Sequence, residues 1–238
     1  MSGKTRNGTA LRFEALEPRM LLAGDVLVAV VDGDLVISGD ELGNAIEIMP
    51  GDEAGEYVII GRDTVSGDHL GPTTINGDAQ PLVVTGVTGD FTISMDCRPG
   101  TAEMYGADDC VTLTGRSAGS DDDSAADVPL VVPGDLIVDV HYGDNTVDLN
   151  SVNVGGDATI KMGIGDDGVH MVDVSVVGDM IIDTLYADDI VDLRSLQVGG
   201  DVRVETGTED DIVTVHSVIV SGDLRIHAGL DYDSVDLY

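Results

Sequence analysis

Residues 134–155 read GDLIVDVHYGDNTVDLNSVNVG, and residues 156–177 read GDATIKMGIGDDGVHMVDVSVV. The two segments align without a gap, and Gly-Asp pairs open further segments at the same spacing of twenty-two residues, at Gly178, Gly200 and Gly222. Thirteen residues after each Gly the same residue type recurs, at Val147, Val169, Val191, Val213 and Val235. A fixed period of this length indicates a repeat architecture in which each unit packs on its neighbours.

Each repeat holds three short segments in which apolar and polar residues alternate. Alternation with a period of two is typical of a strand that buries one face. One repeat cannot bury these faces alone, so each strand is expected to pair with its equivalent in the next repeat. The pattern predicts an all-β fold, a right-handed parallel β-helix (solenoid) with three short strands per coil and a rise of about 4.8 Å per coil.

The same template begins upstream at Gly33-Asp34 and at Gly89-Asp90. We therefore expect about seven coils of twenty-two residues, beginning at Gly33, Gly89, Gly134, Gly156, Gly178, Gly200 and Gly222. The spacings before Gly134 exceed the period, which predicts insertions at about 51–84, 98–106 and 115–128 within a β-helix over residues 26–238. The first insertion contains the apolar run 57–60 and is expected to form an extra hairpin or a cap.

The N-terminal segment differs from the repeats, because four of the 11 basic residues lie in its first nineteen positions. Residues 16–22 read LEPRMLL. This segment resembles the LEPR-XLL segment at the start of many large secreted or surface proteins of planctomycetes and some proteobacteria. The resemblance implies export or surface attachment for residues 1–25, as a disordered segment or a short helix, and an extracellular or cell-surface location. The alternative is a short amphipathic helix with no role in export.

Composition excludes several classes of protein. The 238 residues include 45 acidic and 11 basic ones, for a net charge of −34, and such a charge repels phosphate backbones, so no nucleic-acid partner is expected. No run of about 18 apolar residues is present, so no transmembrane helix is expected. The hydrophobic content of 42% is too high for a disordered acidic tail. What remains is a folded and very acidic protein.

The two cysteines, Cys97 and Cys110, flank the second insertion. An insertion whose ends return to adjacent coil positions brings its flanking residues close together. We therefore expect a disulfide between Cys97 and Cys110, which would contribute about 3 kcal/mol through loop entropy. This bridge agrees with an oxidising compartment outside the cytoplasm. The alternative is a pair of reduced thiols in a loop.

Aspartates recur in columns when the repeats are aligned. One column follows the glycines and is expected to cap the corners through Asx-turn hydrogen bonds. Two neighbouring columns run through Asp144, Asp166, Asp188 and Asp210, and through Asn145, Asp167, Asp189, Asp211 and Asp233. Unit charges about 4.8 Å apart repel by roughly 0.9 kcal/mol in water and more at lower dielectric. Such columns cost stability unless cations occupy them.

Hard oxygen ligands at short spacing suit Ca²⁺, which takes six to eight oxygens. The candidate metal ligands are Asp144, Asp166, Asp167, Asp188, Asp189, Asp210, Asp211 and Asp233. Residues 163–169, GIGDDGV, resemble half of the calcium-binding nonapeptide of RTX proteins, although Met162 stands where the nonapeptide has its first Gly. The resemblance implies Ca²⁺ bound by Asp167 and by neighbours from the next coil. The alternative is that these aspartates are turn residues on an acidic, solubilising surface.

Catalytic motifs are missing from the sequence: it has no G-x-S-x-G elbow, H-E-x-x-H, phosphate loop or Cys/His dyad. We expect a non-enzymatic extracellular or cell-surface module with a structural or adhesive role, stabilised by calcium. The alternative is a β-helix enzyme that cleaves polysaccharides, as a lyase or hydrolase. The chain ends at Tyr238, seventeen residues into its last repeat, so we expect either a piece of a longer solenoid or end-to-end self-association through the open coil.

Overall fold

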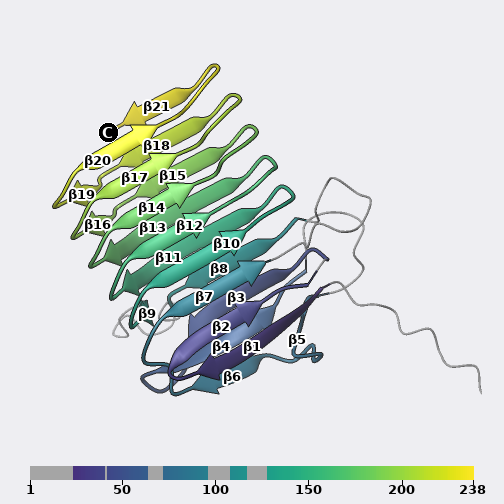
Figure 1. Ribbon diagram of the computed structural model, residues 1–238. Helices are drawn as coiled ribbons and strands as arrows, with labels where there is room; N and C mark the ends of the chain where they lie inside the picture. The colour runs from purple at the N-terminus through teal and green to yellow at the C-terminus, as the bar shows by residue number, and fades with distance from the viewer. Residues whose placement is uncertain (1–23, 41, 64–71, 96–107, 117–127) are drawn as a thin grey trace, which may run out of the picture.

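The computed structural model describes residues 24–40, 42–63, 72–95, 108–116 and 128–238, and these ranges contain strands and no helix. Residues 16–22, which carry the LEPR-XLL resemblance, Cys97 and the insertion predicted at 98–106 lie outside the described residues, as does most of the insertion predicted at 115–128. The chain is all-β, with parallel strands in stacked sheets, which is the arrangement of a β-solenoid (Figure 1). The all-β prediction is therefore confirmed.

Two parallel sheets run along the length of the stack. The first contains β2 (Asp34–Ser38), β7 (Phe91–Met95), β10 (Leu136–Val140), β12 (Ala158–Lys161), β14 (Met180–Asp183), β17 (Val202–Glu205) and β20 (Leu224–His227). The second contains β3 (Ala45–Pro50), β8 (Cys110–Thr114), β11 (Thr146–Val154), β13 (Gly168–Val176), β15 (Ile190–Arg194), β18 (Ile212–His216) and β21 (Ser234–Leu237). Short strands pair beside the second sheet: β9 (Leu130–Val132), β16 (Gln197–Val198) and β19 (Ile219–Val220).

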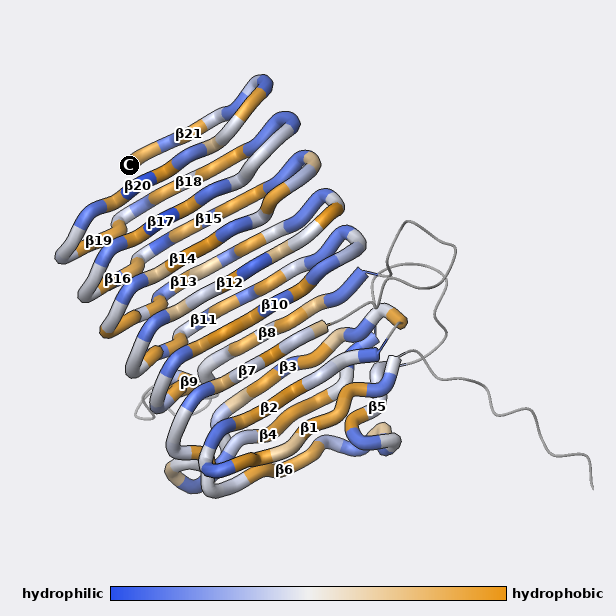
Figure 2. The backbone as a smooth tube through the Cα atoms, viewed as in Figure 1, coloured by the Kyte–Doolittle hydropathy of each residue, from blue (hydrophilic) through white to orange (hydrophobic). Residues whose placement is uncertain are grey.

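The register between strands follows the sequence repeat. Val147 pairs with Val169, Val169 with Val191, and Val191 with Val213, and all four are fully buried. Across the longer spacings, Phe91 pairs with both Leu35 and Leu136, so the insertions leave the stacking intact. Figure 2 shows the resulting alternation of apolar and polar residues along each strand. The predicted interior column of valines is confirmed.

Two repeats contain fewer separate strands than the three that the sequence predicts. In β11 and β13 the second and third segments form one strand with a bend. The bend lies at a residue with positive φ that is not glycine, and the same position recurs in later repeats: Ser151 (54°), Asp173 (55°), Ser195 (55°) and Ser217 (56°). Short polar side chains tolerate this left-handed conformation better than β-branched ones do. The corner is therefore made by one residue, which the alternation pattern alone does not mark.

Antiparallel strands cover the N-terminal end of both sheets (Figure 1). β1 (Asp25–Val31) pairs antiparallel with β2, and β5 (Thr74–Ile75) pairs with β1. β4 (Glu56–Gly61) pairs antiparallel with β3, and β6 (Leu82–Thr85) pairs with β4. The segment at 51–84 thus supplies strands that prolong both sheets, with β4 covering the edge of β3, while β1 covers the edge of β2.

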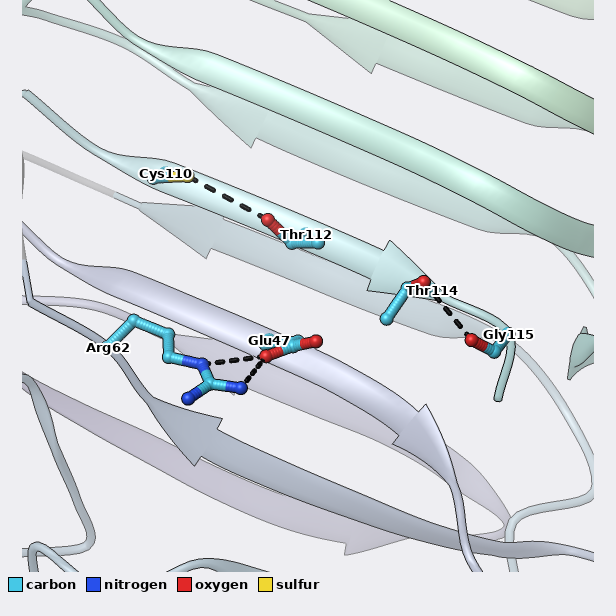
Figure 3. A network of polar contacts seen from close by, with 6 residues as sticks. All are labelled: Glu47, Arg62, Cys110, Thr112, Thr114 and Gly115. Atoms are coloured by element: carbon cyan, nitrogen blue, oxygen red, sulfur yellow. Dashed lines mark hydrogen bonds and ion pairs between the residues drawn. The ribbon is translucent and has the colours of Figure 1, made fainter. Parts of the chain in front are cut away.

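Polar contacts on the outer faces of β3, β4 and β8 are shown in Figure 3. The Arg62 guanidinium donates two hydrogen bonds to one carboxylate oxygen of Glu47, with the Nε bond at 2.6 Å. Cys110 is half-buried at the start of β8, and its Sγ lies 3.8 Å from Thr112 Oγ1. Because Cys97 is not described, the disulfide stays a prediction.

Candidate functional site

The aspartates of the Gly-Asp pairs bond to the backbone of the next repeat. Asp135 Oδ1 accepts a hydrogen bond of 2.8 Å from the N–H of Asp157, and Asp157 Oδ1 accepts one from Asp179. The same bond joins Asp34 to Asp90, Asp90 to Asp135, Asp179 to Asp201 and Asp201 to Asp223, at 2.8–2.9 Å. The expectation of local Asx-turn bonds is corrected here, because these carboxylate oxygens accept from a neighbouring repeat.

Glycine precedes these aspartates because no side chain fits at that position. A Cβ on Gly156 would lie 1.9 Å from Asp135 Oδ1, and one on Gly178 would lie 1.9 Å from Asp157 Oδ1. The same approach, at 2.0–2.1 Å, holds at Gly89, Gly134, Gly200 and Gly222. The Gly-Asp pairs from Gly89 to Gly200 therefore combine two functions: the glycine leaves room for the aspartate of the preceding repeat, and the aspartate accepts a hydrogen bond from the following repeat.

An exposed column of aspartates lines the opposite corner. Asp144 Oδ1 accepts a hydrogen bond of 3.0 Å from the N–H of Asp166. The bond recurs from Asp188 to Asp166 (3.2 Å), from Asp210 to Asp188 (2.9 Å) and from Tyr232 to Asp210 (3.0 Å). These aspartates lie on the surface, and each of them accepts from the later repeat. We refer to Asp144, Asp166, Asp188 and Asp210 as the exposed column.

A second column lies one residue further along the chain and points into the interior. This buried column consists of Asn44, Asp109, Asn145, Asp167, Asp189 and Asp211, all at most 3% exposed. Here the bond runs in the other direction: Asp189 Oδ1 accepts from the N–H of Asp167 at 2.9 Å, and Asp211 Oδ1 accepts from Asp189 at 2.9 Å. The remaining bonds measure 2.7–3.2 Å and end at the half-buried Asp233.

The second carboxylate oxygens of the buried column have unequal surroundings. Asp167 Oδ2 accepts from the N–H of Gly163 at 3.2 Å, and Asp211 Oδ2 accepts from the Thr206 hydroxyl at 2.6 Å. Asp109 Oδ2 and Asp189 Oδ2 are buried without a hydrogen-bond partner. Burial raises the pKa of Asp109 and Asp167 to about 7 and that of Asp189 to about 8, and it also raises the pKa of Asp211. Burial also raises the pKa of Asp148 and Asp183, which lie outside this column.

Sequence reasoning could have identified the buried column from the strand period. Asp167, Val169 and Met171 follow each other at intervals of two, so the inward direction of the two apolar residues extends to the aspartate. The same parity holds for Asp189 and Asp211 with their following strand residues.

The predicted calcium ligands lie in these two columns and, for Asp233, at the end of the buried one. In all eight, Oδ1 already accepts a backbone N–H from a neighbouring repeat. Ca²⁺ takes six to eight oxygens in one shell, and among the described residues no group of three or more His, Cys, Asp or Glu is placed to hold a metal ion. Calcium stays a prediction of the sequence, and the function proposed below does not depend on it.

A shallow depression lies beside the exposed column, lined by Asp166, Tyr186, Ala187, Asp188, Thr208 and Glu209. Its three carboxylates give it a negative potential that disfavours anionic ligands. The lining contains no histidine, cysteine or basic residue that could act as nucleophile or proton donor beside them.

No protein-family model, curated protein or solved structure matches this chain significantly. In the part of the chain that the structure describes, no helix has the length and apolarity needed to cross a bilayer. A function must therefore be argued from the residues and the geometry.

Proposed function

We propose that this chain is a non-catalytic structural module, a right-handed parallel β-helix of about seven coils of twenty-two residues that acts as a stiff spacer or adhesive rod. The observation that carries this proposal is the use of the polar side chains at the corners. Both the Gly-Asp corners and the two aspartate columns bond one repeat to the next. Side chains engaged in this way stiffen a stack and are not free to bind a substrate.

The proposed location is outside the cell or on its surface. The support is the LEPR-XLL resemblance of residues 16–22. A tagged chain expressed in a cell that carries the matching export machinery should be degraded when intact cells are treated with protease. Protection of the tag in intact cells, with degradation after lysis, would contradict this location.

The rod-like shape can be measured directly. Seven coils at about 4.8 Å per coil span about 34 Å, and small-angle X-ray scattering should give a rigid particle with a stacked region of that length. Deleting one complete repeat, residues 156–177, should shorten the particle by one coil and leave it folded, because the flanking repeats present equivalent faces. Loss of folding on this deletion would contradict a stack of interchangeable coils.

The polysaccharide-cleaving alternative is favoured by one feature, the carboxylates of Asp166 and Asp188 in the shallow depression. Incubation with neutral and uronic-acid polysaccharides, followed by measurement of new reducing ends and unsaturated products, tests it. We expect no turnover. Turnover that disappears in both the Asp166→Asn and the Asp188→Asn variants would replace the structural proposal by an enzymatic one.

End-to-end self-association is a separate part of the proposal. Val235 in β21 is 42% exposed, whereas its equivalent Val213 is fully buried. Unpaired strand edges with apolar side chains are templates for pairing with another chain. Sedimentation velocity over a wide concentration range should reveal association, and a monomer at the highest concentration would contradict it.

A further inference from the structure

The last repeat of the stack exposes side chains whose equivalents are buried in the repeat before it. Leu224 in β20 is 39% exposed, whereas Val202, its partner in β17, is fully buried. In β21, Val235 and Leu237 are 42% and 61% exposed, and Leu237 pairs with Val215, which is 5% exposed. β20 and β21 are the end strands of their sheets (Figure 1). An apolar surface is therefore left uncovered at this end of the stack.

The backbone at the same end lacks partners as well. In the first sheet the N–H that opens a strand donates to a carbonyl oxygen of the following repeat, as from Met180 to Asp201 and from Val202 to Asp223, both at 2.8 Å. Leu224 holds the same position in β20, and no described strand follows β20. Its N–H therefore lies at an open sheet edge, and such an edge is a template for pairing with another strand.

The opposite end of the stack is covered in the part of the chain that the structure describes. In the first sheet the end strand is β5, where Ile75 and Asp78 exchange N–H to carbonyl bonds of 2.7 and 3.0 Å. In the second sheet the end strand is β6, whose inward residue Val84 is only 9% exposed. This end therefore does not offer the open edge and uncovered apolar residues that a head-to-tail contact with β20 and β21 needs.

Antiparallel strands provide the cover at that end. β1 pairs antiparallel with β2, and β4 pairs antiparallel with β3. The register sets inward residues opposite inward residues: Val28 lies opposite Ile37, and Ile59 lies opposite Ile48, and all four are at most 8% exposed. An antiparallel strand with the same alternation therefore closes the core at the end of this stack.

We propose that a second copy of the chain covers β20 and β21, so that two stacks join tail to tail in a closed dimer. This inference rests on the proposed self-association of the module and adds its partner and its geometry. A copy that approaches with its own C-terminal end is related to the first by a twofold axis, so its strands run antiparallel to those they meet. β20 then pairs with β20 of the second copy, and β21 with β21. Because both C-terminal ends are used, association stops at two copies.

Matching of the inward faces fixes the register of this contact. A shift by one residue would turn every inward side chain outward, so only inward residues can stand opposite each other. Leu224 then lies opposite Ile226 of the second copy, and Val235 lies opposite its Leu237. These four residues continue the interior across the contact, because their equivalents in the preceding repeat line the core.

A single twofold axis serves both strand pairs. The register centres them on Arg225 and Asp236, which stand five residues before position 230 and five residues after position 231, equally far from the turn that joins β20 to β21. The axis places each of them opposite its own copy. Arg225 already forms ion pairs with Asp223 and Asp201, whereas Asp236 has no ion pair among the described residues. The two Asp236 carboxylates therefore repel each other, and added salt should strengthen the dimer.

Sedimentation velocity over a wide concentration range tests the closed dimer. Monomer and dimer should be the only species, and the dimer fraction should rise with salt. Small-angle X-ray scattering of the dimer should give a stacked region of about 67 Å, twice the length expected for one copy. Species that keep growing beyond the dimer would overturn the tail-to-tail geometry and leave end-to-end association standing. A rod-shaped monomer at the highest concentration would overturn the association and leave the structural module standing.

The decisive variant is Leu237→Lys, with Val83→Lys as its matched control. Both residues are exposed apolar side chains of end strands, at 61% and 54%, but Val83 lies in β6 at the opposite end of the stack. Both variants lower the net negative charge equally, so a general effect of charge would act on both. Only Leu237→Lys places a charge in the proposed core, which should raise the dissociation constant of the dimer about tenfold or more. An unchanged constant for Leu237→Lys, or an equal rise for Val83→Lys, would overturn the proposal.

A cross-link keeps the proposal testable if Leu237→Lys fails to fold. Asp236 lies on the proposed axis, so Asp236→Cys in a chain that also carries Cys97→Ser and Cys110→Ser places two thiols opposite each other, with about 5 Å between their Cβ atoms. Mild oxidation should yield a covalent dimer, and Val83→Cys in the same background should not. Failure of Asp236→Cys to cross-link, or equal cross-linking of the two variants, would overturn the proposal.

Discussion

Replacing Gly89 by alanine tests the central packing rule of the Gly-Asp corner. Gly89 lies outside the left-handed region, so its backbone accepts an alanine. The new Cβ would lie 2.0 Å from Asp34 Oδ1, while the next atoms, Asp34 Cγ and the Gly33 carbonyl oxygen, stand at 3.3 and 3.6 Å. One oxygen of one flexible side chain is therefore in the way. Asp34 must rotate out and give up its 2.9 Å hydrogen bond from the N–H of Asp90.

The expected loss in the free energy of unfolding follows from that hydrogen bond. A hydrogen bond to a charged group contributes about 1.5–3 kcal/mol, so Gly89→Ala should lower the free energy of unfolding by about 2 kcal/mol. Asp34→Ala removes the same bond and should cost the same amount. The double variant loses the bond once, has no clash and gains about 0.4–1 kcal/mol from the less flexible unfolded chain. We therefore expect a coupling of about 2 kcal/mol between the two substitutions.

Urea unfolding monitored by circular dichroism at constant salt gives the four free energies of this cycle, provided that the slope with urea is the same in all variants. Gly86→Ala is the matched control, because Gly86 has φ of +81° and no atom within 4 Å of its Cβ position. It should cost about 1 kcal/mol through backbone strain alone and show no coupling to Asp34→Ala. Additive costs for Gly89→Ala and Asp34→Ala would refute the claim that the glycine exists to accommodate the carboxylate.

Three further predictions concern the core, the surface and metal ions. Leu193→Ala, at a fully buried position, should cost about 2–5 kcal/mol in urea unfolding, and a cost below about 1 kcal/mol would contradict a close-packed interior. Arg62→Ala, which breaks an exposed ion pair with Glu47, should cost less than about 1 kcal/mol in the same assay, and a larger loss would show that the pair orders β4. Calorimetry with added Ca²⁺ tests the predicted metal site, in which Oδ1 of each ligand already accepts a backbone N–H. A rise in melting temperature larger than that with Mg²⁺ at equal ionic strength would support the site, and an equal rise would contradict it.

The stacking of this fold could be predicted because the sequence repeats its interior residues at a constant interval. The partners of Val169, namely Val147 and Val191, stand one repeat before it and one repeat after it, and both pairs are in register. Even the irregular spacings were interpretable, since the Gly-Asp pair at Gly89 identified which strand residues correspond. Because equivalent strands pair in parallel, residues one sequence period apart are also paired in the sheet, and the register can therefore be predicted from the period.

The direction of the side chains at the corners does not follow from the repeat alone and requires the strand period as well. Asp166 and Asp167 are neighbours with the same recurrence, yet one lies on the surface and the other is 2% exposed. A column in the alignment shows that side chains stack, but their environment depends on whether the strand period extends into the turn. It does so at Asp167, and this continuation converts an apparent cation ligand into a buried acceptor of a backbone N–H.

The two aspartate columns together explain why a chain with this charge can stack at all. At the junction between the repeats of Asp167 and Asp189, the exposed Asp166 accepts an N–H from the later repeat, and the buried Asp189 accepts one from the earlier repeat. Every such junction is thus bonded in both directions, and each carboxylate faces the positive end of a backbone dipole instead of another carboxylate. The exposed members are in contact with water, whereas burial raises the pKa of Asp167, Asp189 and Asp211. It follows that substituting an exposed aspartate by asparagine changes mainly the response to salt, whereas the same substitution in the buried column changes mainly the response to pH.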